Sequence, residues 1–174
     1  MNEALQNLLT RRSCRKYKPE QISAEELDAI LLAGIYAPTG RNGQSPIIVA
    51  VQSEDDRAAV ERLNAAVMGN PESKPFYGAP TVIVVFGDSD SPFCASDGNL
   101  VMGNLLNAAH AEGVDSCYIW RAREAFESEE GKALKAKWGV PENYVGLGNV
   151  ILGYGEEGGI REAAPRKDGY VIRV

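Results

Sequence analysis

Residues 97–112, DGNLVMGNLLNAAHAE, constrain the fold more than any other stretch of this sequence. Their spacing predicts a helix whose apolar side chains occupy most of its circumference: Leu100, Val101, Leu105, Leu106, Ala108 and Ala109. A helix that is apolar nearly all round must be covered on several sides. Gly98 and Gly103 weaken it unless close packing compensates. The sequence therefore predicts a long central helix, which we expect Ser96 or Asp97 to cap.

Stretches rich in β-branched residues predict buried strands around this helix, at 47–52, 81–87, 116–120 and 145–155. The closing residues, 170–174, also alternate like a strand. Apolar spacing predicts further helices at 3–10, 54–68 and 123–138, and one between Ser23, whose capping box includes Glu26, and Pro38. Such a mixture indicates an α+β or α/β arrangement around one sheet. With 174 residues and no linker, we expect one domain, 1–174.

The net charge of −6 argues against a general nucleic-acid binder, because such proteins need a broad cationic face. No apolar run is long enough to span a membrane and no signal peptide is apparent, so we expect a cytoplasmic protein without a membrane partner. The cysteines, Cys14, Cys94 and Cys117, have no metal-binding spacing and His110 is the one histidine. We therefore expect reduced thiols and no metal site.

The cations concentrate in residues 11–18, RRSCRKYK, which hold five of the 18 Lys and Arg residues and no carboxylate. Arg11, Ser13 and Arg15 supply two guanidinium forks and a hydroxyl within five residues, which suits a phosphate. A solvated turn is the alternative. Two other segments add to the candidate site, a second basic pair at Arg166 and Lys167 and the amides of Asn42 and Gln44.

None of these residues is a proton-transfer group, a pattern that suits a bound cofactor which carries the chemistry itself. A nucleophilic Cys14, activated by Arg12 and Arg15, is a minor alternative. The glycines Gly146 and Gly148 do not form a dinucleotide fingerprint, because they lie within a strand pattern and no helix follows.

Taken in order along the chain, these motifs resemble the FMN-dependent nitroreductase family. The family's R-R-S-x-R-x-[FY] and A-P-S-x-x-N-x-Q-P patterns are similar to RRSCRKY and APTGRNGQSP here. The similarity continues through FYGAPTVIVV, the central helix, GVDSCYIW and VPENYVGLGNVILGYGEE, and closes with a late Pro-Arg-Lys. It covers nearly the whole chain in the right order. Gln-Ser-Pro after Gly43 departs from the more frequent Gln-Pro-Trp.

The resemblance implies an α+β fold with a central, mostly antiparallel sheet flanked by helices, and a homodimer with an FMN in each of two clefts between subunits. By position, Arg11, Arg12, Ser13 and Arg15 would contact the phosphate, ribityl chain and pyrimidine side of the flavin. The partner subunit would contribute Pro38, Thr39, Gly40, Asn42 and Gln44. The remaining residues that the resemblance implies are Asn70, the backbone of Ile119 and Trp120 near flavin N5, and Arg166 with Lys167 at the phosphate.

The implied activity has two half-reactions, hydride transfer from NAD(P)H to flavin N5 and then reduction of a small-molecule acceptor such as a nitroaromatic or a quinone. No catalytic side chain is expected, and a cation near the flavin would stabilise the reduced form. Two alternatives stay open. One is an FMN-binding protein that does not use NAD(P)H, serving ferredoxin-linked electron transfer or flavin storage, and the other is an anion-binding domain without a flavin.

Overall fold

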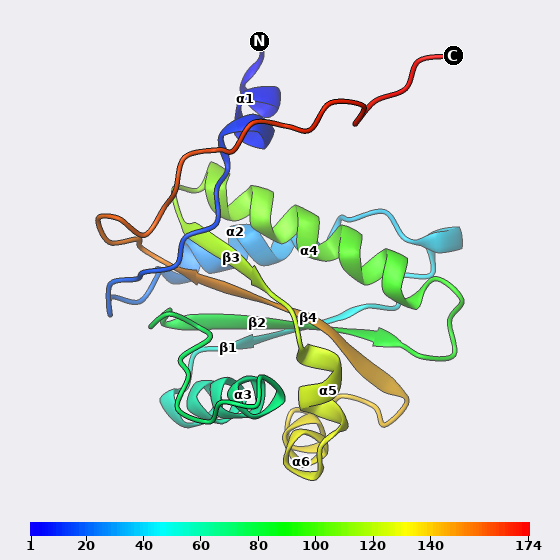
Figure 1. The fold of residues 1–174 in the computed structure, drawn as a ribbon. Coiled ribbons are helices and arrows are strands. Elements are labelled where there is room, and N and C mark those ends of the chain that lie inside the picture. The colour runs from blue at the N-terminus through cyan, green and yellow to red at the C-terminus, as the bar shows by residue number, and fades with distance from the viewer.

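A computed structural model describes all of residues 1–174 and contains one sheet of four antiparallel strands (Figure 1). Their order across the sheet is β1-β2-β4-β3. The strands are β1 (Ile47–Val51), β2 (Thr81–Asp88), β3 (Asp115–Ile119) and β4 (Tyr144–Gly153). Because β3 has a strand partner only on its β4 side, it forms one edge of the sheet. The predicted antiparallel α+β fold is confirmed.

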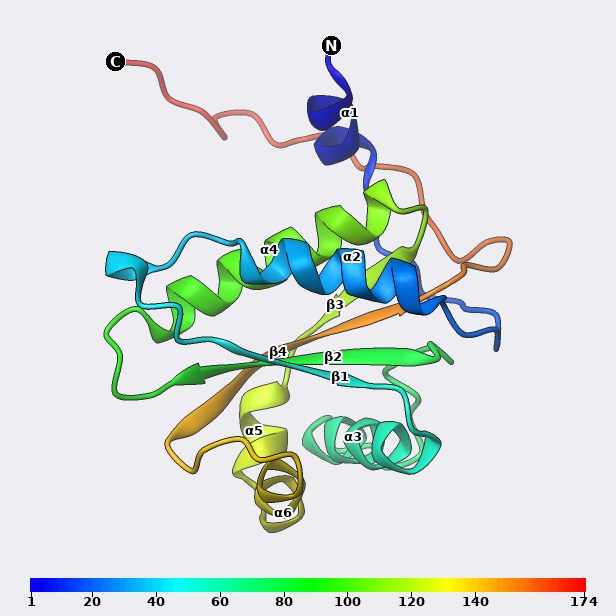
Figure 2. The same cartoon turned by 180° about the vertical axis from the view of Figure 1, so that it is seen from behind.

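Helices cover both faces of the sheet (Figures 1 and 2). One face carries α2 (Ala24–Ile35) and α4 (Cys94–Ala111), with α1 (Glu3–Thr10) beyond them. The other carries α3 (Glu54–Val67), α5 (Ala122–Glu127) and α6 (Glu129–Lys137). Side chains of β2 alternate between the two faces. Ile83 and Val85 join the core under α2 and α4, whereas Val82 and Val84 join the core over α3 and α5.

The central helix α4 is confirmed, but its start differs from the expectation. It begins at Cys94 with Phe93 as N-cap residue, and no side chain caps it. The expected cap by Ser96 or Asp97 is therefore wrong. Asp97 lies inside the first turn of α4 and is buried, and its carboxylate accepts a hydrogen bond from the backbone amide of Gly40. The helix instead begins from the turn at 91–93, in which the Cys94 amide donates to the Ser91 carbonyl.

Two other expected elements also differ. The helix expected at 123–138 is two helices, because Ser128 leaves helical geometry and its hydroxyl caps α6 by accepting the Gly131 amide. Residues 170–174 form no strand in the single chain and are exposed, since no neighbouring strand pairs with them. None of the helices combines the length and the apolar character that crossing a bilayer requires.

Candidate functional site

The basic stretch 11–18 lies beside the start of β3. Ser13 pairs with Ser116 in a parallel bridge, and the Cys14 amide donates to the Ser116 carbonyl at 3.0 Å. On the other side, the Arg15 amide donates to the Gly159 carbonyl at 2.8 Å. Cys14 and Tyr17 are buried, while Arg15 is exposed. The backbone is thus held by both neighbours, and Arg15, Lys16 and Lys18 are exposed.

Two polar atoms next to this stretch are buried and have no hydrogen-bond partner, Arg11 Nη1 and Ser116 Oγ. Such atoms are rare in folded proteins and call for an explanation. Arg12 differs from its neighbour, because its Nη1 donates to the carbonyls of Leu9 at 2.8 Å and Arg11 at 2.7 Å. Arg12 therefore satisfies carbonyls at the end of α1. Arg11 and Ser116 each keep an unpaired donor, and the Ser116 backbone is bridged to Ser13 of the basic stretch.

Cys14 is buried and is not an activated nucleophile. Burial is the main cause that raises the pKa of its thiol, and the thiol donates to the Lys16 carbonyl at 3.1 Å. A raised pKa keeps the thiol protonated and unreactive. His110, the one histidine and so the one imidazole that could serve Cys14 as a base, shares a 2.8 Å hydrogen bond with the Thr10 hydroxyl and joins α4 to α1. The alternative of cysteine catalysis is therefore wrong.

The far end of β3 is held by a buried pair of amides. Asn149 Nδ2 donates to the Ile119 carbonyl at 3.1 Å and to Asn64 Oδ1 at 3.2 Å. Trp120, which follows, is 62% exposed and so is not a core residue. Beyond Ser116, no strand pairs with the outer edge of β3. The result is a free sheet edge between the basic stretch and Trp120.

The loop 38–44 has a tightly defined shape. The Gly40 amide donates to Asp97 Oδ1 at 2.9 Å, and a Cβ at Gly40 would lie 2.3 Å from the Phe93 ring. Gln44 Nε2 donates to Asn42 Oδ1 at 3.1 Å, so the two amides expected to contact a heterocycle are aligned with each other. Arg41 also lies over the Phe93 ring, 6.0 Å from its centroid. Pro38 and Thr39 lead into this loop, where Thr39 Oγ1 accepts the Gln44 amide at 3.0 Å.

Within one chain these two parts of the expected site are far apart. Thr10, the residue before the basic stretch, is bonded to His110 near the C-terminal end of α4, and the loop is anchored near the N-terminal end of α4 through Gly40 and Asp97. His110 comes thirteen positions after Asp97 in the helix, which corresponds to about 20 Å. Figures 1 and 2 show the loop and the basic stretch at opposite ends of α4.

Three further expected residues are not brought to the basic stretch by any contact. Arg166 and Lys167 lie in the exposed C-terminal segment, which passes α1 and extends away from the molecule (Figure 1). Asn70 is exposed in the connection after α3 and contributes only backbone hydrogen bonds, to Ala65 and Ser73. Their roles at a cofactor remain predictions.

Sequence reasoning did not identify Ser116, Asp97 or Asn149 as parts of this region. Ser116 gains its importance only from its register with Ser13, which no local pattern indicates. Asp97 was noticed, but as a helix cap. Asn149 lies within an apolar strand, and a buried amide there was a signal that could have been followed.

The chain is similar to nitroreductases over its whole length. The sequence model of the Nitroreductase family matches residues 8–77. A protein of Archaeoglobus fulgidus, named provisionally as an NADH dehydrogenase/NAD(P)H nitroreductase, is 33% identical over 88% of this chain and 86% of its own length. Among solved structures, the FMN-bound nitroreductase of Bacteroides fragilis superposes with a TM-score of 0.90 at 30% identity, covering 100% of both chains. The FMN-bound nitroreductase of Desulfitobacterium hafniense gives 0.88 at 28% identity, again with complete coverage. The chain belongs to the nitroreductase family.

Proposed function

We propose that residues 1–174 form one FMN-binding domain of an NAD(P)H-dependent oxidoreductase. The observation that carries the proposal is the buried Nη1 of Arg11, which has no partner and belongs to the residue two positions before Ser13, where the chain bridges to the start of β3. A guanidinium fork and serine hydroxyls within one short stretch match the chemistry of a phosphomonoester. The names of the relatives support the cofactor and the donor, since they include FMN-bound structures and NAD(P)H nitroreductases.

The residues present fit the cofactor at both ends of the free edge. Arg11, Ser13 and Arg15 would hold the phosphate and the adjoining chain. The backbone of Ile119 and Trp120 would lie against the ring system, and Asn149 would keep that backbone in place. Arg166 and Lys167 would complete the phosphate site and Asn70 would contact the ring. In this proposal Arg12 supports the stretch through its bonds to α1.

The second part of the site would come from a partner subunit. Because about 20 Å of α4 separates the anchor of the loop 38–44 from that of the basic stretch, we expect the loop of a partner subunit, and not that of the same chain, to contact the cofactor. A homodimer in which two copies pair their helical faces would place Thr39, Gly40, Asn42 and Gln44 of one copy opposite Arg11 of the other. Each dimer would then contain two equivalent sites.

A bound flavin supplies the redox chemistry, taking up a hydride from NAD(P)H and passing two electrons to an acceptor such as a nitroaromatic or a quinone. The chain contributes binding, orientation and charge. Arg11 and Arg15 supply positive charge fixed in advance, which favours the reduced, more negative form. The Asp115 carboxylate of β3 accepts the Gly155 amide at 2.9 Å, and we expect protons to exchange with solvent.

The test is an absorbance spectrum of the purified protein, followed by anaerobic addition of NADPH and of NADH. We expect flavin bands that either donor bleaches and that a nitroaromatic or a quinone restores. Bands that neither donor bleaches would overturn the NAD(P)H reaction and favour the alternative of ferredoxin-linked transfer or flavin storage. A protein that stays colourless with added FMN would overturn the proposal as a whole.

A further inference from the structure

Arg121, the residue that follows Trp120, has a backbone conformation that is unusual for its type. Its φ of 80° and ψ of 8° are left-handed, and it stands between the end of β3 and the start of α5. Glycine adopts this conformation without penalty, whereas a residue with a Cβ is strained. Strain of this kind persists where the surrounding structure holds it, often at ligand sites.

The side chain of Arg121 carries a second cost. Its Nε is buried without a hydrogen-bond partner, and none of the chain's ion pairs includes it. Arg123, two residues further on, shows the ordinary arrangement, because its Nε contacts Glu127 Oε1 at 3.1 Å. A guanidinium that is partly removed from water and not neutralised favours binding of an external anion.

Arg121 and Arg11 are the two arginines with a buried, unpartnered nitrogen, and they lie at opposite ends of the free edge of β3. Arg11 precedes Ser13, which bridges to Ser116, and Arg121 follows the end of the strand. Arg121 comes five positions after Ser116 along a nearly extended chain, which corresponds to about 17 Å. The edge strand is therefore bracketed by two cations without partners, and the proposed phosphate site uses only one of them.

We propose that Arg121 binds the carboxylate of an aromatic electron acceptor and so selects anionic acceptors over neutral ones. The inference rests on the proposed function, which places the reacting ring at the same end of β3. The planar guanidinium fork matches a carboxylate, and the exposed Trp120, which precedes Arg121 in the chain, offers an aromatic surface. The ligand class is thus an aromatic acid that carries a reducible group.

The decisive variant is Arg121→Gly, because glycine suits the left-handed backbone and should keep the fold intact. Benzoate and its neutral analogue benzamide are titrated calorimetrically into the flavin-loaded protein. We expect Arg121→Gly to weaken benzoate binding about tenfold or more, as loss of a charge-assisted pair does, with a much smaller effect on benzamide. The ratio of kcat/KM for 4-nitrobenzoate to that for nitrobenzene should fall by a similar factor.

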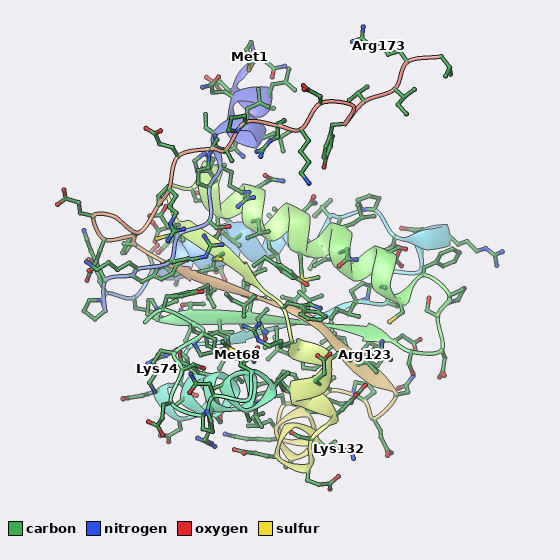
Figure 3. The ribbon with its side chains drawn as sticks, in the orientation of Figure 1. Met1, Met68, Lys74, Arg123, Lys132 and Arg173 are labelled. Carbon is green, nitrogen blue, oxygen red and sulfur yellow. The ribbon has the colours of Figure 1, made fainter.

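Arg123→Ala is the matched control, since it removes the same charge from a residue of α5 (Figure 3). It should leave unchanged both the affinity for benzoate relative to benzamide and the ratio of the two kcat/KM values. Wild-type protein that does not bind benzoate, or equal losses for benzoate and benzamide, would overturn the inference. A shift of the flavin potential in Arg121→Gly with unchanged benzoate affinity would also overturn it and assign Arg121 to the cofactor. If the protein takes up no FMN, benzoate is titrated into the flavin-free chain. Benzoate binding that still depends on Arg121 would then support the anion site at Arg121, although the proposed FMN site would be wrong.

Discussion

Arg11 and Arg12 are adjacent in the sequence but have different roles in the structure. Arg12 donates to two carbonyls at the end of α1, so its position is explained by the fold alone. Arg11 has a buried nitrogen without a partner, which the fold alone does not explain. A basic run in a sequence cannot separate these two cases, because both residues carry the same charge. The difference appears only when hydrogen bonds are assigned.

Arg11→Ala should weaken FMN binding about tenfold or more, because a charge-assisted bond to the phosphate is lost. Arg15→Ala should have an effect in the same direction. The dissociation constant can be measured by titrating flavin-free protein and following flavin fluorescence. Arg57→Ala, which removes the same charge from α3, should bind FMN like the wild type. Unchanged affinity in both Arg11→Ala and Arg15→Ala would remove the phosphate assignment.

How much of the site could be predicted differs from residue to residue. The charge cluster identified Arg11, Ser13 and Arg15 because cations so concentrated in an acidic chain form a local signal. Ser116 and Arg121 gave no such signal. The first depends on strand register and the second on a backbone angle, and both are set by contacts between distant parts of the chain.

Among the elements, α2 has the most completely specified start. The Ser23 hydroxyl accepts the Glu26 amide at 3.1 Å, and the Glu26 carboxylate accepts the Ser23 amide at 2.7 Å. The same carboxylate accepts the Tyr154 hydroxyl at 2.7 Å, which joins the helix to the segment after β4. The capping box was readable from sequence because it is local. The bond to Tyr154 was not, because the two partners are 128 positions apart in the sequence.

Glu26→Ala should lower the free energy of unfolding by about 1–2 kcal/mol. The hydrogen bonds from Tyr154 and from the Ser23 backbone hold the pKa of the Glu26 carboxyl below its usual range. A lowered pKa in the folded state means that this stabilisation is fully present above the ordinary glutamate pKa, about 4.3, and is lost as the pH falls through the lowered value.

Urea unfolding at neutral pH and in acid measures the effect, and the gap between wild type and Glu26→Ala should narrow in acid. Glu25→Ala is the control, since that exposed carboxylate shares the first turn but makes neither bond. A gap that stays constant down to acid pH would show that the charge of Glu26 contributes nothing.

Element boundaries followed the strength of local signals. The strands were predicted within one or two residues because their β-branched runs are continuous. The break at Ser128 was missed because the flanking helices share an apolar spacing. The cap itself, in which Ser128 accepts the Gly131 amide, is local and could have been predicted from the sequence. The final segment, 170–174, alternates apolar and polar residues like a strand but forms none, because a strand also needs a neighbouring strand to pair with.

At the scale of the whole molecule, a single chain leaves large apolar side chains uncovered on the helices above the sheet in Figure 1. They are Leu5, Leu8 and Leu9 of α1, Leu32 and Ile35 of α2 with the adjacent Tyr36, and Leu100 of α4. Exposed apolar surface of this extent marks an interaction face. It lies on the same helices that the proposed dimer would pair.

Sedimentation velocity should therefore show a dimer that carries FMN. Leu9→Glu places a charge on this face and should shift the protein toward monomer with loss of FMN, because the site needs both copies. Val67→Glu, at the exposed end of α3, is the matched control and should remain a flavin-loaded dimer. A flavin-loaded monomer would contradict a site built from two subunits.

The anchors at the two ends of α4 also restrict how this protein can change. Gly40 is bonded to Asp97 and Thr10 to His110, so α4 fixes both the distance and the angle between the loop 38–44 and the end of α1. An inserted or deleted residue between Asp97 and His110 would rotate one anchor by about 100° relative to the other. We therefore expect the length of α4 between these two anchors to change only by about a whole helical turn.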